Sequence, residues 1–544
     1  MKTGSAVSAG GSFGGDDTPL FLQLMKVMRV CGVVAGLMSL WVPASGKVVL
    51  PAMYGSDMVV QQQSVAHFYG KATPGADVTI EAAWLKKPVA ARADNFGNWE
   101  ADVATGKGGR RGYEVRFTDS ADGQSLKLEN VALGEVWFCS GQSNMEMPVS
   151  DWGKVKDFEK EMADAANYPW VRLLHVKRHT DIMPQTEPVI DNGGGWRVCS
   201  PEAVEKFSAI GYFFGRQMEG ELGVPVGIVD CTWGGSPVEA WVSYATLSRG
   251  SGFDGVVKDF VKEGMDELSI RGFYQALVDS AMAGKNPCPA VHPDAYAHKS
   301  GFPGTVDKNG FLPCELFNAM LLPMTRMEIR GVLWYQGEQN GDRPFQYQCL
   351  FPAMISEWRS LWGKPEMPFY FVQLANYRDQ KDVEPHAEWG YLREAQAEAL
   401  NLRATGMAVA TDVGEAKDIH PKNKQEVARR LALLALDKTY GRKVVSEAPA
   451  YAGYSIENGK IYVSFNAGAR EFAPETGAID GFVIAGHDGR FYKGEARREG
   501  DRIAVSSPDV EFPVAVRYCW ADNPKVGLRG KTGLPVAPFR TDKW

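Results

Sequence analysis

The segment GEVWFCSGQSNMEMPV, residues 134–149, decides the fold of this chain. Its first half contains a continuous apolar and aromatic run from Val136 to Cys139, and this run stops at Ser140-Gly141, a pair typical of turns. A short apolar run of this kind is typical of a strand that is buried on both faces. We therefore expect residues 135–139 to form a core strand and the polar residues after it to lie at its carboxyl end.

Further segments of this type follow along the chain at residues 226–230, 331–335, 369–373 and 407–411. The stretches between them include helical patterns, and the clearest one spans residues 424–440. There Val427, Leu431 and Leu434 recur at helical spacing. Buried strands that alternate with helices predict an α/β fold, in which a parallel sheet lies between two layers of helices.

The segments on either side of this region have a β pattern. Before it, short alternating stretches such as residues 64–70 and 113–117 are separated by turn signals, which is the spacing of a β-sandwich. After it, residues 460–465 and 514–518 repeat that pattern. We therefore expect four parts: an upstream segment with a signal peptide (1–46), an N-terminal β-sandwich domain (47–133), the central α/β domain (134–445) and a C-terminal β domain (446–544).

Residues 25–46 have the order of a secretory signal. Met25 to Arg29 carries positive charge, Val30 to Val42 is apolar, and Pro43 to Gly46 is rich in small residues. The apolar run is too short for a membrane span, which needs about 20 residues. We expect a secreted or periplasmic protein without membrane association after signal cleavage. A secretory signal normally stands at the N-terminus, whereas residues 1–24 precede this one. We therefore expect translation to start at Met25 or Met28.

The composition is that of a folded soluble chain, with 44% apolar and 23% charged residues. The 59 basic and 66 acidic residues leave a net charge of −7, so no positive field attracts nucleic acid. The cysteines that remain after signal cleavage are far apart and form no CxxC pair, and Cys288 with Cys314 is the best candidate for a bridge. The sequence carries no signal for an oligomeric state.

Polar and glycine-rich residues follow several of the predicted strands. In an open parallel sheet, ligands bind beyond the carboxyl ends of the strands, so these junctions are where a site is expected. A fourth polar loop precedes the predicted helix at residue 424. The four segments are SGQSNM (140–145), TWGGS (232–236), YQGEQN (335–340) and KDIHP (417–421).

These loops contain the groups needed for attack by a serine. A serine hydroxyl becomes a nucleophile when an imidazole takes its proton, and a carboxylate orients that imidazole. Ser143, His420 and Asp418 supply the three groups. In an extended segment, residues two apart share a face, so Asp418 can reach His420. The chain order serine, acid, histidine is one of those in which such triads occur.

A serine esterase also needs donors for the oxyanion that forms on the attacked carbonyl. The backbone N–H groups of Ser143 and Gly235 and a side-chain amide from the third junction are candidates. Gly234 and Gly235 would let the backbone approach a ligand closely, since glycine has no Cβ. Each residue also has an ordinary role as a turn, cap or loop residue, and the four junctions taken together favour the catalytic interpretation.

At these residues the chain resembles the sialate O-acetylesterase family, a carbohydrate esterase type within the SGNH hydrolase group. The resemblance covers almost the whole mature chain, from about Lys47 to Trp544. It includes the C-terminal segments AVRYCWADNP and GLPVAPFRTD. The segments that carry it most clearly are GEVWFCSGQSNMEMPV, TWGGSPVEAWVS, GVLWYQGEQN, PFYFVQLANYR and DIHPKNKQEVARRLALLA. It implies an SGNH-type three-layer α/β/α sheet with flanking β domains.

The resemblance also implies roles for single residues. Ser143 would be the nucleophile, His420 the general acid and base, and Asp418 its partner. Many SGNH enzymes place the acid three residues before the histidine, but that position is Lys417 here, so Asp412 is the reserve. Gly235 and Gln336 would donate to the oxyanion, with Gly234 as a substrate contact and Asn340 as the second choice. Apart from the resemblance, Glu338 is expected to be a structural buried acid that backbone donors satisfy, rather than a direct participant in catalysis.

No cofactor or metal is expected. The sequence has no GxxxxGK[ST] phosphate loop and no HExxH pair, and the proposed chemistry needs neither. The loop at residues 284–311 contains potential ligands whose spacing matches no zinc pattern. They are Cys288, His292, Asp294 and His298.

The sequence therefore predicts an exported serine esterase that removes O-acetyl groups from a sugar or glycan through an acetyl-enzyme. One alternative is an acetylesterase that acts on plant polysaccharides such as xylan or xyloglucan. Another is a catalytically silent carbohydrate-binding protein, against which the intact Ser143, Asp418 and His420 argue. Trp152 and Trp233 are candidates for contact with the sugar or for the core.

Overall fold

A single long strand, β7 (Ser125–Gly141), joins two sheets into one. From Glu135 onward it lies between β10 (Val226–Thr232) and β11 (Gly331–Tyr335) and pairs with both in parallel. Its residues are buried continuously from Val131, as expected for a central strand. The computed structural model describes residues 48–181, 183–191, 195–249, 311–384, 386–473 and 477–544.

The central part of the sheet has the order β13-β12-β11-β7-β10-β8-β9. Neighbouring strands pair in parallel except β9, which is antiparallel to β8. The five predicted core strands are confirmed, and β8 was missed because Arg172 and His175 interrupt its apolar pattern. The remaining strands are β8 (Val171–His175), β9 (Arg197–Val198), β12 (Phe369–Gln373) and β13 (Thr405–Val409).

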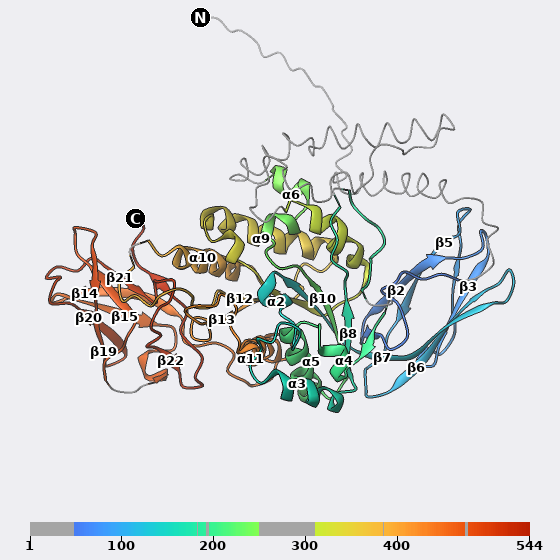
Figure 1. Ribbon diagram of the computed structural model, residues 1–544, viewed down its shortest axis with the longest axis horizontal. Coiled ribbons are helices and arrows are strands. Elements are labelled where there is room, and N and C mark those ends of the chain that lie inside the picture. Colours follow the sequence, from blue (N-terminus) through green and yellow to red (C-terminus); the bar gives the residue numbers. More distant parts are fainter. Residues whose placement is uncertain (1–47, 182, 192–194, 250–310, 385, 474–476) are drawn as a thin grey trace, which may run out of the picture. The chain divides into compact units, whose positions relative to one another are not determined.

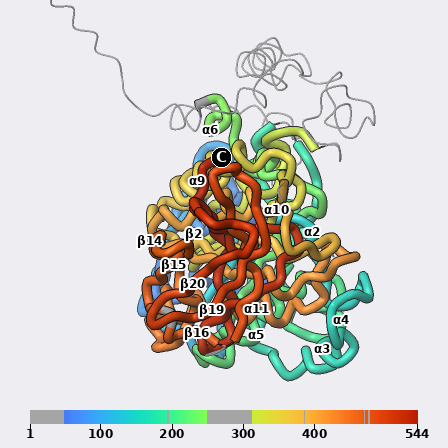
Figure 2. Tube along the Cα trace, turned by 90° about the vertical axis from the view of Figure 1, so that its left-hand side faces the viewer, coloured from blue at the N-terminus to red at the C-terminus, as the bar shows by residue number. Residues whose placement is uncertain are grey.

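Helices cover both faces of this parallel sheet. α5 (Ala209–Leu222) and α11 (Lys424–Leu434) lie side by side on one face, and α9 (Pro344–Leu361) and α10 (Glu388–Ala397) lie on the other (Figures 1 and 2). The expected α/β/α layers are therefore present. The shorter helices are α2 (Ser143–Glu146), α3 (Phe158–Asp164), α4 (Pro201–Val204) and α6 (Tyr244–Arg249).

Capping residues set the ends of the covering helices. Ser208 accepts a hydrogen bond from the Gly211 N–H at the start of α5, and Gly223 closes this helix with a left-handed φ of 65°. The Asn423 side chain accepts from the Glu426 N–H at the start of α11. The predicted helix at 424–440 is α-helical only to Leu434, because a π-helical segment, η8 (Ala435–Thr439), follows it.

The N-terminal β structure is built on the first part of β7. β1 (Val59–Gln61) and β6 (Gly112–Asp119) pair with β7, and β3 (Asp77–Ala82) and β4 (Val89–Arg92) extend the sheet from β6. β2 (Val65–Lys71) and β5 (Asn98–Ala104) form a separate antiparallel pair. The predicted boundary between residues 133 and 134 falls inside β7, so the N-terminal and central regions share one strand.

The C-terminal region is antiparallel and has its own core. One sheet has the order β14-β15-β20-β19 and another has the order β18-β17-β21-β23. Ile461, Phe482 and Tyr518 are among the buried residues between them. The strands are β14 (Tyr451–Glu457), β15 (Lys460–Phe465), β16 (Phe472–Ala473), β17 (Phe482–Ala485), β18 (Phe491–Lys493), β19 (Glu495–Glu499), β20 (Arg502–Ser506), β21 (Ala515–Tyr518), β22 (Arg529–Gly530) and β23 (Phe539–Arg540).

Several expectations fall outside the described residues. These include the signal segment at 25–46 and, in the proposed bridge, Cys288. The expected partner, Cys314, is buried as a free thiol, and no disulfide is present in the described part of the chain. None of the helices that the structure describes is long and apolar enough to cross a membrane.

Candidate active site

The Ser143 side chain lies at a sharp turn between β7 and α2. Gly141 ends the strand with φ of 132°, and a Cβ at this position would collide with the Tyr335 carbonyl oxygen of the neighbouring strand. Glycine is therefore required for the close approach of the two backbones. α2 begins at Ser143, so the Ser143 N–H belongs to a helical first turn, whose N–H groups have no acceptor within the helix.

Ser143, His420 and Asp418 lie in one hydrogen-bonded chain. Nε2 of His420 is 3.0 Å from Oγ of Ser143, although the two residues are 277 positions apart in sequence. Nδ1 of His420 is 3.2 Å from Oδ1 of Asp418, and the His420 backbone N–H donates to the same oxygen at 3.0 Å. This second bond fixes the carboxylate beside the ring. The loop at 418–420 therefore carries both the imidazole and the group that orients it.

The surroundings favour a neutral imidazole and an ionised carboxylate. Burial lowers the pKa of His420 below its usual 6.5, and the positive charges of Lys424 and Lys154 lower it further, against the opposing effect of Asp418. Burial raises the pKa of Asp418, but hydrogen bonds from Lys154 Nζ and the His420 N–H outweigh it, so the pKa is lowered overall. A neutral imidazole next to a carboxylate can accept the serine proton.

The loop at Gly234 and Gly235 packs directly against the serine. A Cβ added to Gly234 would lie 3.3 Å from Cβ of Ser143 and 3.0 Å from the Glu146 carboxylate. The Gly234 N–H donates to that carboxylate, so its hydrogen bond is already made to a side chain of the protein. Gly235 has a left-handed φ of 75°, which glycine adopts without strain. The glycine pair thus brings backbone close to Ser143.

Gln336 and Asn340 form a buried amide pair. Nε2 of Gln336 donates to Oδ1 of Asn340 at 2.7 Å and to the Ser236 carbonyl at 3.3 Å, while Oε1 of Gln336 has no hydrogen-bond partner among the described residues. Nδ2 of Asn340 donates to Glu239 at 2.8 Å. The Gln336 amide must therefore release part of this network before it can donate to a bound oxyanion.

A second buried network, which the sequence analysis missed, connects the serine turn to the histidine loop. Nζ of Lys424 donates to Oδ1 of Asn144 at 2.6 Å. Nδ2 of Asn144 donates to the Ile419 carbonyl at 3.1 Å and to the Glu338 carboxylate. Asn144 follows Ser143 directly, and its side chain is bonded to Ile419, the residue before His420. Asn144 thus ties the serine loop to the histidine loop.

Burial disfavours charge in this network. It lowers the pKa of Lys424 from 10.5 to about 7, and it raises the pKa of Glu338. Glu338 is partly buried, and its carboxylate lies inside the protein: Asn144 donates to Oε1, while Oε2 is buried and has no partner among the described residues. Lys424 was detectable from sequence, because it lies three and seven positions before Val427 and Leu431, on the apolar stripe of α11.

Asp412, the alternative acid, does not contact His420, and the two candidate tryptophans, Trp152 and Trp233, contact different rings. Asp412 forms an ion pair with Arg430 at 2.6 Å and with Arg529, whereas Asp418 is the acid in contact with His420. The Trp152 ring lies edge to face with the His420 ring at 5.7 Å. Trp233 packs against Phe311 at 5.3 Å. The Trp152 ring therefore borders the histidine of the candidate site.

Within the described residues, no group of three or more histidine, cysteine or acidic side chains is arranged to hold a metal ion. The four potential ligands in the sequence, Cys288, His292, Asp294 and His298, lie outside these residues.

Known proteins resemble the part of the chain that contains this arrangement. A family model described as "Carbohydrate esterase, sialic acid-specific acetylesterase" matches residues 133–283 and 313–436, which include Ser143, Gly235, Gln336 and His420. A solved carbohydrate acetylesterase from Xanthomonas citri is 33% identical, with a TM-score of 0.73, and the match covers 91% of this chain and 100% of that one.

Curated relatives lead to the same family. The sialate O-acetylesterase of Mus musculus is 30% identical over 419 residues, which is 71% of this chain and 72% of the relative. The human sialate O-acetylesterase is 29% identical over 451 residues, which is 76% of each chain. The chain is thus a carboxylic ester hydrolase and belongs to the sialic acid-specific acetylesterase family of carbohydrate esterases.

Proposed function

We propose that this protein is an exported serine esterase that releases acetate from O-acetylated carbohydrates through an acetyl-enzyme, with Ser143, His420 and Asp418 as its catalytic residues. The observation that carries the proposal is the continuous contact from Oγ of Ser143 through the His420 ring to Asp418. The family membership supports an O-acetylated sugar as substrate. The signal-like segment at 25–46 supports export to the periplasm or the medium.

In the first half of the reaction, Oγ of Ser143 attacks the acetyl carbonyl carbon and its proton moves to Nε2 of His420. The carbonyl oxygen becomes an oxyanion, for which the N–H groups of Ser143 and Gly235 and the Gln336 amide are the proposed donors. The bond from the carbonyl carbon to the sugar oxygen then breaks, and His420 returns the proton to that oxygen. The deacetylated sugar leaves and the acetyl group remains on Ser143.

In the second half, a water attacks the acetyl carbon while His420 accepts one of its protons. Collapse of this intermediate breaks the bond to Oγ, and the His420 proton returns to Ser143. Acetate is released and the enzyme is restored. Asp418 stabilises the charged imidazolium in both halves, because Lys154 and the His420 N–H keep its carboxylate ionised.

The acetyl-enzyme can be observed directly. A rapid acid quench of the enzyme during turnover of an aryl acetate, followed by peptide mass spectrometry, should find one acetyl group on the peptide that contains Ser143. Acetate release from a panel of O-acetylated sialic acids, xylan and xyloglucan then identifies the carbohydrate. An enzyme that turns over rapidly with no acetylated peptide under any quench condition would contradict the covalent mechanism.

The pH profile should show an acid limb below pH 6.5. Catalysis requires neutral His420, so kcat/KM should fall as the pH drops through the pKa of this residue, which burial and nearby lysines lower from 6.5. In Lys424→Met the loss of a positive charge should raise that pKa and move the midpoint to higher pH.

Lys422→Met is the matched control, since Lys422 pairs with Glu415 and lies at the surface. Its midpoint should coincide with that of the unaltered enzyme. A Lys424→Met midpoint that stays in place or moves to lower pH would refute the electrostatic effect of Lys424, whatever the height of the activity plateau.

A further inference from the structure

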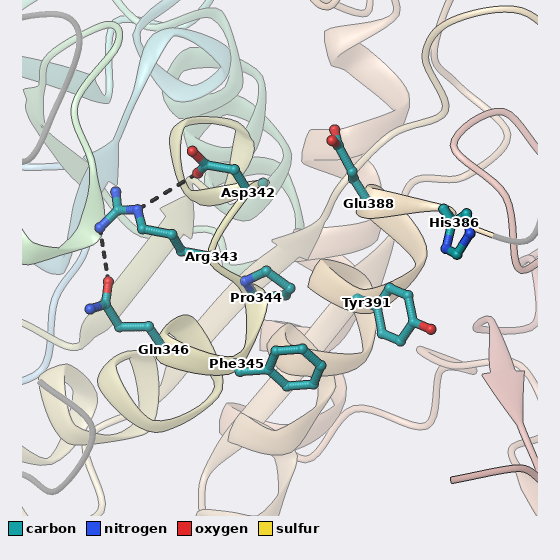
Figure 3. A pocket seen from close by; sticks show the side chains of 9 residues that line it. Asp342, Arg343, Pro344, Phe345, Gln346, His386, Glu388 and Tyr391 are labelled. Atoms are coloured by element: carbon teal, nitrogen blue, oxygen red, sulfur yellow. Dashed lines mark hydrogen bonds and ion pairs between the residues drawn. The ribbon is translucent and has the colours of Figure 1, made fainter. Parts of the chain in front are cut away.

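A cavity of about 450 Å³ opens between the loop after β11 and the start of α10. In Figure 3, Asp342 and Arg343 lie on one side of this cavity and His386 and Glu388 lie on the other, with the rings of Phe345 and Tyr391 nearby. All of these residues follow the carboxyl ends of β11 and β12, the edge of a parallel sheet at which ligands bind.

Hydrogen bonds and an ion pair connect the rim of this cavity to residues of the candidate site. The Gly341 N–H, at the rim of the cavity, donates to the Glu338 carbonyl, and the Glu338 carboxylate accepts from Asn144, the residue after Ser143. On the other side, Arg343 pairs with Glu239 at 2.5 Å, and Glu239 also accepts from Asn340. The loop that carries Glu338 and Asn340 of the candidate site therefore also forms one wall of the cavity.

The aromatic side chains of the cavity are placed to contact a ligand. Phe345 is 68% exposed, and its ring centroid lies 6.0 Å from that of Tyr391. Tyr391 is fixed by the Trp520 ring at 5.3 Å and by the Arg540 guanidinium at 5.1 Å. A phenylalanine that is exposed beside a rigid second ring leaves apolar surface that a flat sugar ring can cover.

The charges of the cavity favour a neutral ligand with hydroxyl groups. Asp342 and Glu388 are exposed carboxylates that pair with Arg343 at 3.6 Å and with Arg378 at 3.0 Å, and their remaining lone pairs can accept hydrogen bonds from hydroxyls. The arginines beside them are already paired, Arg343 with Glu239 and Arg378 with Asp522 and Glu388. An acidic sugar would meet two carboxylates here without a free arginine, so its binding is disfavoured.

On this basis we propose that the cavity is a subsite for a neutral sugar unit of an O-acetylated oligosaccharide or polysaccharide, with Phe345 as the stacking residue. The inference rests on the proposed esterase function and extends it to the substrate class. The acetylated unit would lie at Ser143 and a neighbouring neutral unit of the same glycan would lie on Phe345.

The test compares Phe345→Ala with the unaltered enzyme on three acetates: an aryl acetate, an O-acetylated monosaccharide and an O-acetylated neutral xylo-oligosaccharide. We expect kcat/KM for the oligosaccharide to fall about tenfold, mainly through KM, because the variant loses the apolar surface that the sugar covers. The values for the aryl acetate and the monosaccharide should be unchanged. Phe512→Ala is the matched control, since Phe512 is equally exposed, at 68%, on the C-terminal region.

Each failure has a distinct pattern. An equal loss on all three acetates, or no loss on the oligosaccharide, would overturn the subsite. So would an unaltered enzyme that hydrolyses the two small acetates and leaves the oligosaccharide intact. An unaltered enzyme that hydrolyses none of the acetates would instead overturn the proposed esterase function.

Discussion

Ser143→Ala should lower kcat for acetate release by about 10⁴-fold or more and leave the protein folded. The substitution removes the atom that forms the covalent bond to the acetyl group. Its structural effect is small, because Oγ of Ser143 is partly buried and bonds only one side chain of the described residues, His420 at 3.0 Å. We therefore expect a stability loss of about 1 kcal/mol, the typical value of one hydrogen bond. Initial rates on an aryl acetate, together with the melting temperature, measure both effects.

Two further variants make this prediction more specific. His420→Ala should lose nearly as much activity as Ser143→Ala, and the double variant should lose no more than either alone, since the two groups act as one unit. Ser150→Ala is the matched control, because the Ser150 hydroxyl contacts the Met162 sulfur outside the catalytic chain. Additive losses in the double variant would show that Ser143 and His420 act independently, against the proposed mechanism.

Arg393→Met should destabilise the protein by about 3–5 kcal/mol or more. Arg393 is fully buried on α10 and donates to four backbone carbonyls at 2.6–2.9 Å. Two of these carbonyls, of Leu374 and Ala375, follow β12, and the other two, of Ala521 and Asp522, belong to the C-terminal region. Methionine supplies no donor, so all four buried carbonyls would lose a hydrogen bond.

Burial lowers the pKa of Arg393 to about 10, so it remains protonated at neutral pH and keeps all its donors. Loss of these hydrogen bonds should lower the melting temperature and increase the rate of proteolysis near residues 519–524. Arg403→Met is the control, since Arg403 is 87% exposed and makes a surface ion pair with Glu366 at 3.2 Å. Its effect should stay within about 0.5 kcal/mol. A melting temperature of Arg393→Met close to that of the control would show that these carbonyls find other donors.

The core strands were predictable because burial on both faces leaves a continuous apolar pattern. Residues 331–335 and 369–373 coincide with β11 and β12 at both ends. β8 was not predicted, because the polar residues Arg172 and His175, at its second and last positions, interrupt the apolar pattern. The sequence also did not show that the predicted domain boundary at residues 133 and 134 lies inside one strand. The hydrophobic pattern of β7 does not indicate that its two halves pair with different sets of strands.

The candidate site was predictable in part. The sequence marked the junctions that carry Ser143, Asp418 and His420, because polar residues at the ends of buried strands are conspicuous. It did not show that the Gln336 and Asn340 amides bond to each other, that the Gly234 N–H is held by Glu146, or that Asn144 links the serine and histidine loops. Those bonds join residues from different loops, and no local pattern encodes them.

The sequence by itself determined the layers of this protein and the chemical groups available at one edge of its sheet, because apolar periodicity and strand-end positions are local properties of the chain. The tertiary structure alone decided which groups meet. It placed an imidazole 3.0 Å from a hydroxyl 277 residues away and buried Lys424 beside Asn144. It also aligned Phe345 and Tyr391 on one cavity. Distances between loops depend on how helices and strands pack around them, and packing is a property of the whole folded chain.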